Sequence, residues 1–389
     1  MRINLLKHLL FIFFSFLSDI YSQSNESKVP FIGIYETPPN KDMNLSPGFI
    51  FSSAPYYNIW NTKVKFNILD IDKFANGLTP LETTAGAMTK SLLLRGGNGI
   101  KYIFRPLKKI PSTLLDFTSN QFLKSSLNDH FIIYFPYAPS IVSFLSDKIE
   151  LPHTSPILCI LPRSEKLDIF SEEFSFLPGY LELYISPSCK YITIKSEITS
   201  VDITSPEIFK NDSIDISSYL KMKLLDAFIG DWDRHEDQWK WVKFNKSQLW
   251  IPVAFDRDCA FTNIKGTLLH TYLNLNNYSY QTKQFNNVLD VICNYENTIK
   301  NPERLMARSY KYDLKIIPQI SEKDYFKIVN DFVMILSDDV IKSAIEKIPA
   351  EVYKQMGNEL YTTMQLRRND MLNFSKNYYS FLRKQQKTN

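Results

Sequence analysis

The spacing of apolar residues changes near residue 205, and this change constrains the fold more than any other feature of the sequence. After that point apolar residues recur mostly at helical intervals, apart from one hairpin. Before it they gather in short runs typical of strands, among them 48–57, 63–71, 91–94, 101–105 and 180–185. The sequence therefore predicts an α+β chain in two lobes, a strand-rich N-lobe over 48–204 and a mostly helical C-lobe over 205–389.

Turn and cap residues predict where several elements begin and end. Gly96, Gly97 and Gly99 separate two apolar runs and predict a hairpin, because tight turns need positive φ. Asp215 or Ser217 can cap the start of a helix, and Gly230 can end it.

Two helices are expected near the C-terminus. Ser337 can cap the first, and Pro349 stops it. Its apolar face comprises Ile341, Ala344, Ile345 and Ile348. The second is expected over 358–384, with Gly357 as the break before it.

The residues before 48 are expected to lie outside the lobes. Arg2 and Lys7 precede an uncharged apolar run over 9–17, which indicates a signal peptide over 1–22. The alternative is an uncleaved anchor, but the run is shorter than the ~20 residues that span a bilayer. Residues 23–47 are polar and rich in proline, and we expect an extended lead-in. We therefore expect export to the periplasm, the outer membrane or the exterior, with no transmembrane segment in the mature chain.

Composition excludes several classes of protein. Hydrophobic residues make up 44% of the chain, too many for a disordered protein. The net charge of +4 is too small for a strongly cationic nucleic-acid binder, so no nucleic-acid partner is expected. Aromatic residues make up 14%, which indicates a large packed core or a wide apolar groove. The four cysteines match no zinc spacing, and either unpaired buried thiols or one or two disulfides fit them.

Acidic and aromatic residues crowd into 226–261, which includes four of the five tryptophans. The helix that ends at Gly230 leads into an acidic loop, and 238–244 and 249–255 alternate as the two strands of a hairpin. Trp239 and Trp241 share one face of the first strand, where packing against a helix is the more common role.

The expected pairing of this hairpin places Gln238 opposite Phe255 or Asp256. Two sets of carboxylates, around Asp233 and around Asp256 with Asp258, should therefore meet. Like charges this close raise one another's pKa, and a hard divalent cation such as Mg²⁺ or Mn²⁺ would relieve the repulsion. The remaining carboxylate could orient or deprotonate a hydroxyl, as phosphoryl transfer requires. The alternative is a surface loop in which Arg234 and Arg257 pair with the aspartates.

The order of helix, DRH loop, hairpin and D-x-D resembles the atypical kinase-like superfamily, which includes HipA-type kinases, CotH spore-coat kinases and secretory-pathway kinases. The resemblance implies a protein-kinase-like fold and a catalytic position for Asp233, followed by Arg234 and His235. It also implies metal-ligand positions for Gln238, Asp256 and Asp258.

The first half adds to this resemblance. By its position before the hairpin, the loop of Gly86, Ala87, Met88 and Thr89 corresponds to a phosphate loop, and Arg105 stands where HipA-type kinases have lysine. Residues 50–382 look like an uncharacterised family of secreted bacterial proteins. Its motifs, in this chain, are GDWDRHEDQW, FDRDCAF, YIFR, FPY and a C-terminal RR…YY…L helix.

Three departures from the kinase pattern leave the activity open: Arg105 replaces Lys, Gln238 replaces Asn, and the phosphate loop is poor in glycine. The resemblance implies an exported phosphotransferase that uses ATP or another nucleotide, with Mg²⁺ or Mn²⁺, on a hydroxyl acceptor. One alternative is an inactive kinase-like binding or scaffold protein that contacts envelope proteins. The other is a metal-dependent phosphoesterase that uses Asp231, Asp233, His235, Asp256 and Asp258.

Overall fold

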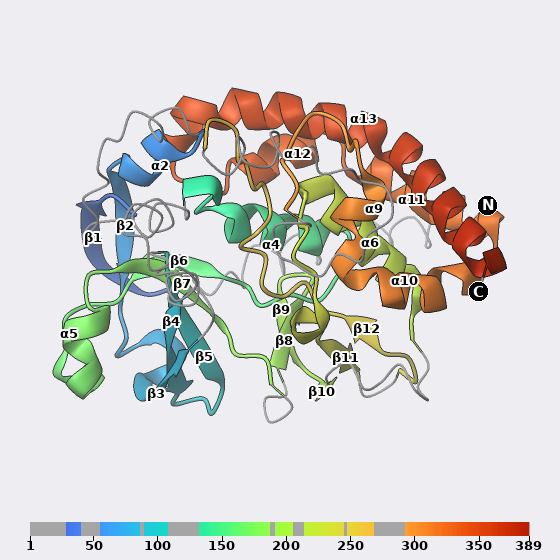
Figure 1. The fold of residues 1–389 in the computed structure, drawn as a ribbon. Helices are drawn as coiled ribbons and strands as arrows, with labels where there is room; N and C mark the ends of the chain where they lie inside the picture. Colours follow the sequence, from blue (N-terminus) through green and yellow to red (C-terminus); the bar gives the residue numbers. More distant parts are fainter. Residues whose placement is uncertain are drawn as a thin grey trace, which may run out of the picture.

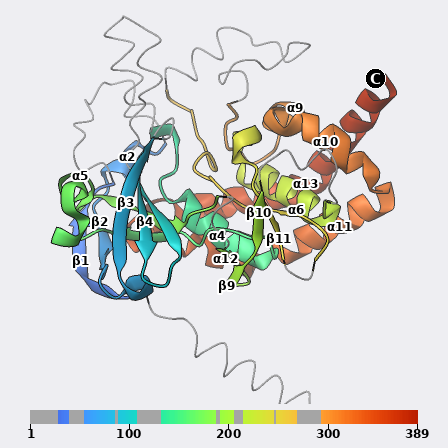
Figure 2. The same ribbon diagram turned by 90° about the horizontal axis from the view of Figure 1, so that it is seen from below.

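The computed structural model describes residues 29–39, 55–85, 89–107, 132–186, 191–204, 214–244, 247–267 and 292–388. Figures 1 and 2 show a large sheet at one end of the molecule and helices α9 to α11 at the other. This confirms the expected α+β class, with strands first and helices after them. The signal peptide over 1–22, and Gly86, Ala87 and Met88, lie outside the described residues.

Within the described residues, seven strands form one mixed sheet in the order β1-β2-β6-β7-β5-β4-β3. All neighbours pair antiparallel except β2 and β6, which run parallel. The strands are β1 (Phe31–Thr37), β2 (Val64–Leu69), β3 (Leu78–Ala85), β4 (Lys90–Gly96), β5 (Lys101–Pro106), β6 (Ile157–Ile160) and β7 (Pro178–Leu183). The edge strand β1 comes from the stretch expected as a lead-in, because its backbone pairs with β2.

The predicted glycine hairpin is confirmed. Strands β4 and β5 pair with Leu93 opposite Ile103, and Gly99 adopts a φ of 82° in the turn between them. Strand β3 pairs with β4 on the other side, so β3, β4 and β5 form a meander. Thr89 directly precedes β4, at the end of the connection from β3.

The described residues also form two smaller sheets. Strands β8 (Tyr191–Ile194) and β9 (Glu197–Ser200) form a hairpin, and β10 (Asp202–Thr204), β11 (Trp241–Lys243) and β12 (Ile251–Pro252) form a short sheet. The segment 48–57 was expected to be a strand, but its described end enters the short helix α2 (Tyr57–Asn61). Ile59 and Trp60 are buried there, and a short apolar run does not distinguish a strand from a buried helical turn.

The helices follow the predicted caps closely. The Asp215 side chain accepts from the amide of Ser218 at 3.0 Å, and Gly230 ends α6 with a φ of 69°. Ser337 caps α12, whose predicted apolar face is buried. The longer described helices are α4 (Ala138–Lys148), α6 (Ile216–Ile229), α10 (Tyr310–Ile316), α11 (Glu322–Ile335), α12 (Asp338–Ile345) and α13 (Ala350–Thr388); α5 (Ser171–Phe174) and α9 (Pro302–Leu305) are single turns.

Helix α13 is longer than predicted and runs along the molecule from α2 to the far end of the helical part (Figure 1). Gly357 lies inside it, so the predicted break there is wrong. A Cβ at Gly357 would lie 2.9 Å from Cδ2 of Tyr353, so the missing side chain leaves room for that ring.

One large core joins the strands to the helices. It contains Phe66 of β2 and Tyr180 of β7 together with Ile141 of α4, Leu224 of α6 and Met364 of α13. A second core covers the other face of the sheet. No disulfide joins Cys159, Cys259 and Cys293 to one another, and Cys189 lies outside the described residues. No helix in the described ranges is long and apolar enough to cross a membrane.

Candidate active site

The acidic loop and the D-x-D turn meet as the hairpin pairing predicted. Trp241 pairs with Pro252 and Val242 with Ile251, in the expected register. The strands are shorter than predicted, because Gln238 ends a single 3₁₀ turn over Glu236–Gln238 rather than starting β11.

Gln238 joins the two carboxylate sets. Its side-chain Nε2 donates to Oδ2 of Asp233 at 3.3 Å and to Oδ2 of Asp256 at 3.4 Å. The two carboxylates, which are distant in sequence, therefore lie on either side of one amide group. Oε1 of Gln238 turns the other way and accepts from Nη1 of Arg234 at 3.4 Å.

Asp233 has a strongly perturbed carboxyl group. Burial raises its pKa to about 7, with the negative charges of Asp258, Asp231 and Asp256 acting in the same direction and Arg308 against them. Nη1 of Arg308 forms an ion pair with Oδ1 of Asp233. The loop thus holds a carboxyl group whose pKa lies near neutral pH.

Asp256 and Asp258 lie on a tight turn after β12. Asp256 has a φ of 50°, a left-handed conformation that costs a non-glycine residue energy and that Asp and Asn tolerate best. Both aspartates line a pocket of about 810 Å³, part of it open to solvent. Its other walls include Thr89, Arg105, Tyr134 and Ser143.

Arg105 faces the same pocket from β5. Its Nε donates to Oε1 of Glu182 on β7 at 2.6 Å, and its guanidinium lies 5.5 Å from the centre of the Phe255 ring. Burial acts to lower the pKa of Arg105, but the charges of Glu182, Asp256 and Asp258 outweigh it, so the pKa is raised. Arg105 is therefore a permanent cation held beside the D-x-D turn.

Arg234 and His235, the two residues after Asp233, have different surroundings. Arg234 is 2% exposed, donates to the carbonyl oxygen of Phe255 at 2.8 Å and stacks on Trp239. Its donors point into the protein, so it holds the loop against the D-x-D turn rather than facing the pocket. His235 is half-buried, and burial together with Arg308 lowers its pKa.

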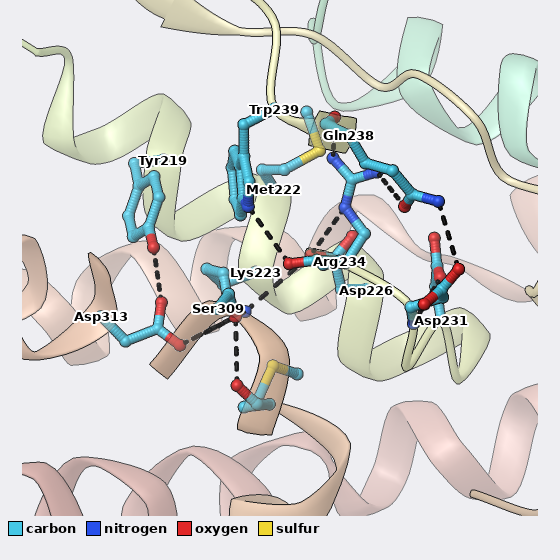
Figure 3. A network of polar contacts seen from close by, with 12 residues as sticks. Tyr219, Met222, Lys223, Asp226, Asp231, Arg234, Gln238, Trp239, Ser309 and Asp313 are labelled. Atoms are coloured by element: carbon cyan, nitrogen blue, oxygen red, sulfur yellow. Dashed lines mark hydrogen bonds and ion pairs between the residues drawn. The ribbon is translucent and has the colours of Figure 1, made fainter. Parts of the chain in front are cut away.

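Beneath the loop lies a buried network of charges (Figure 3). Arg257 donates to Asp231 at 2.8 Å and also pairs with Asp226 of α6, and all three side chains are buried. The arginine–aspartate pairs that the sequence allowed at the surface thus exist, but in the interior. Asp231 is fully buried and committed to Arg257, so it is not available as a ligand or a catalytic group.

The network continues along α6 to α10. Lys223 lies 3.3 Å from Asp313, and the same carboxylate accepts from the hydroxyls of Tyr219 and Tyr378 at 2.6 Å and of Ser309 at 3.2 Å. Figure 3 shows Tyr219 and Lys223 converging on Asp313. These contacts fix α6, from which the loop emerges, to the helical part.

The tryptophans pack as expected. Trp239 and Trp241 stack on one another with ring centres 5.7 Å apart, and both stack on Tyr219 of α6. These rings pack between α6 and the acidic loop, where Nε1 of Trp239 donates to the carbonyl oxygen of Arg234.

The sequence did not single out three groups that the structure brings to this site. Glu182 anchors Arg105, and Arg308 pairs with Asp233. The third is His153, which lines the same pocket. It is buried, its Nδ1 lies 3.0 Å from the Ser143 hydroxyl, and its Nε2 lies 2.8 Å from Asp147.

The arrangement of the acidic side chains and Gln238 bears on the predicted metal site. Among the described residues, no group of three or more His, Cys, Asp and Glu side chains is arranged to hold a metal ion. The chemistry of the donors suits a hard cation, because Asp233, Asp256 and Asp258 are close enough to raise the pKa of Asp233. Gln238 presents its NH₂ group to two of them, so a ligand role would require the amide to turn over.

No protein-family model matches the sequence, and no curated protein matches it. Among solved structures, the Helicobacter pylori proinflammatory kinase CtkA aligns with 78% of this chain and 96% of its own, at 12% identity and a TM-score of 0.39. This is a weak structural likeness to a kinase, too distant to transfer an activity.

Proposed function

We propose that this chain is an exported, kinase-like phosphotransferase that moves a phosphoryl group from a nucleotide to a hydroxyl outside the cytoplasm. One observation carries the proposal: the amide of Gln238 joins Asp233 to Asp256, and Asp256 lines a pocket whose walls also include Arg105. Export rests on the N-terminal sequence alone.

The placement of Arg105 supports nucleotide binding. Protein kinases hold ATP phosphates with a lysine on the third strand of the sheet and pair it with a glutamate. Arg105 stands on β5, the third strand of the β3-β4-β5 meander, and pairs with Glu182. Thr89 lies on the pocket wall, and the loop of Gly86, Ala87 and Met88 precedes it in the chain.

Asp256 and Asp258 would hold Mg²⁺ or Mn²⁺, with the amide oxygen of Gln238 as a further ligand. The bound cation would supply charge neutralisation for the transferred phosphoryl group.

Asp233 is the proposed general base. A pKa of about 7 matches the operating pH of such a base. The acceptor oxygen forms a bond to the γ-phosphorus, the bond from that phosphorus to the β–γ bridging oxygen breaks, and the nucleoside diphosphate leaves. The hydroxyl proton passes to the carboxylate of Asp233.

Thermal unfolding with ATP and Mn²⁺, alone and together, tests the proposal. A phosphotransferase predicts a larger rise in Tm with both than with either alone. An inactive scaffold predicts no rise, and a phosphoesterase predicts a response to metal that ignores the nucleotide. The burial of Asp231 and its ion pair with Arg257 count against the phosphoesterase alternative, which uses that residue.

A further inference from the structure

We propose that Arg308 binds an anionic group on the acceptor, so that the acceptor is an acidic hydroxyl compound such as a phosphorylated or carboxylated alcohol. This inference rests on the proposed phosphotransferase function and names its substrate class.

The first support is the position of Arg308. It belongs to the 3₁₀ turn Ala307–Ser309 in the helical part, and its Nη1 pairs with Oδ1 of Asp233. The side chains of Arg308 and Asp233 are 27% and 18% exposed, so the pair lies at the rim of the site. A molecule that reaches Asp233 from solvent therefore meets Arg308.

The second support is that Arg308 binds Oδ1 of Asp233 rather than Oδ2. Oδ2 is the oxygen that faces Gln238, and through it Asp256, while Oδ1 faces Arg308. The oxygen that faces the proposed nucleotide site, Oδ2, is thus not the oxygen that faces Arg308. A hydroxyl that approaches on the Oδ1 side brings its own substituents, rather than the nucleotide phosphates, to Arg308.

The third support is the number of donors that Arg308 still has. A guanidinium carries five N–H donors in a planar fork that matches carboxylate and phosphate oxygens. Within the described ranges, its one hydrogen bond is to Asp233. Arg308 can therefore keep Asp233 and also bind an oxyanion.

The test compares Arg308→Gln with Lys311→Gln. Lys311 is a matched control, because it is a nearby exposed cation that pairs with Glu236 rather than with Asp233. The probes are glycerol 3-phosphate and glycerol, which share hydroxyl groups but differ in the anion. Affinity is measured by calorimetry with ATP analogue and Mn²⁺ present.

We expect wild type to bind glycerol 3-phosphate and not glycerol, and Arg308→Gln to bind it about 10-fold or more weakly, the loss of a charge-assisted hydrogen bond. Lys311→Gln should bind it like wild type, and Arg308→Lys should recover part of the affinity. Equal affinity in all variants, or no binding by wild type, would overturn the inference.

Two further outcomes distinguish failure of this inference from failure of the proposed function. If Arg308→Gln weakens the nucleotide and the acceptor probe equally, Arg308 contacts the transferred phosphoryl group instead, and the inference is wrong while the function stands. If wild type shows no joint Tm rise with ATP and Mn²⁺, the proposed function itself is wrong.

Discussion

Nη1 of Arg257 lies 2.8 Å from Oδ2 of Asp231 in the interior of the protein, and this pair ties the start of the acidic loop to the D-x-D turn. Arg257→Met removes the ion-pair partner of the buried Asp231 and leaves the buried Asp226 with only longer contacts, to Arg234 at 3.7 Å and Lys223 at 4.0 Å. We expect the free energy of unfolding to fall by ~3–5 kcal/mol, measured by urea denaturation. Arg163→Met, at an exposed site, is the control and should change it little. Equal stability of both variants would contradict the structure.

Lys223 and Asp313 form a second buried pair that can be tested by a double-mutant cycle. Lys223→Met leaves Asp313 charged, and Asp313→Asn leaves Lys223 charged, so each should be costly alone. The double variant removes both charges and should lose ~0.5–3 kcal/mol less than the sum of the single losses. Additive losses would show that the two groups do not interact.

Asp147 should give the protein a defined response to acid. Burial acts to raise its pKa, but the hydrogen bond and charge of His153 and the bonds from Ser196 outweigh it, so the pKa is lowered. The native state then holds the proton less tightly than the unfolded chain. Asp147 therefore stabilises the fold above pH ~4, and this contribution is lost as pH falls through its folded pKa.

The measurement is the unfolding free energy of Asp147→Asn against pH. The deficit relative to wild type should be largest near neutral pH and shrink under acid. Asp202→Asn, on the exposed side of β10, should show no such trend. A deficit that is constant with pH would mean that Asp147 acts by packing alone.

Substitution of Asp233 and substitution of Asp256 should have different effects if the proposed function is correct. Asp233→Asn should keep the Tm rise with ATP and Mn²⁺ and lower phosphoryl transfer by ~10²–10⁴. Asp256→Asn should lose both the Tm rise and phosphoryl transfer. Asparagine tolerates the positive φ of this position, so this variant adds little backbone strain. Asp256→Ala adds backbone strain of ~1–2 kcal/mol, which separates strain from loss of the ligand.

Arg105→Lys should weaken nucleotide binding by about 10-fold or more, although the charge is kept. Lysine cannot reproduce a guanidinium that holds Glu182 through Nε and offers its remaining donors to phosphate. Binding is measured with a fluorescent ATP analogue. Arg95→Lys, an exposed arginine on the neighbouring strand β4, is the control. Equal affinity for both variants would place the phosphates elsewhere.

The sequence predicted the parts of this site that depend on local rules. The alternation around Trp241 and Pro252 set the hairpin register, and that register brought Gln238 to Asp256. The caps at Asp215 and Gly230 were predicted correctly because they depend on a few adjacent residues.

The parts it did not predict depend on packing between distant segments. Arg308 reaches Asp233 from 75 positions away, and Glu182 reaches Arg105 from 77. No periodicity links such residues. At Gly357 the sequence predicted a helix break, but helix α13 continues through it. Packing against Tyr353 overrides the usual tendency of glycine to interrupt a helix.

The placement of the tryptophans gives this protein a built-in optical probe. Trp60 lines the pocket and donates to the carbonyl oxygen of Tyr134, while Trp239 donates to that of Arg234 in the loop. Trp232 and Trp241 are also buried, and Trp250 is half-buried. Ultraviolet emission of the native chain therefore includes a signal from the pocket, through Trp60, and one from the loop, through Trp239. Ligand entry can be followed by intrinsic tryptophan fluorescence without a label. The stacked Trp239 and Trp241 rings should give a near-ultraviolet circular dichroism band, which disappears when the two rings separate.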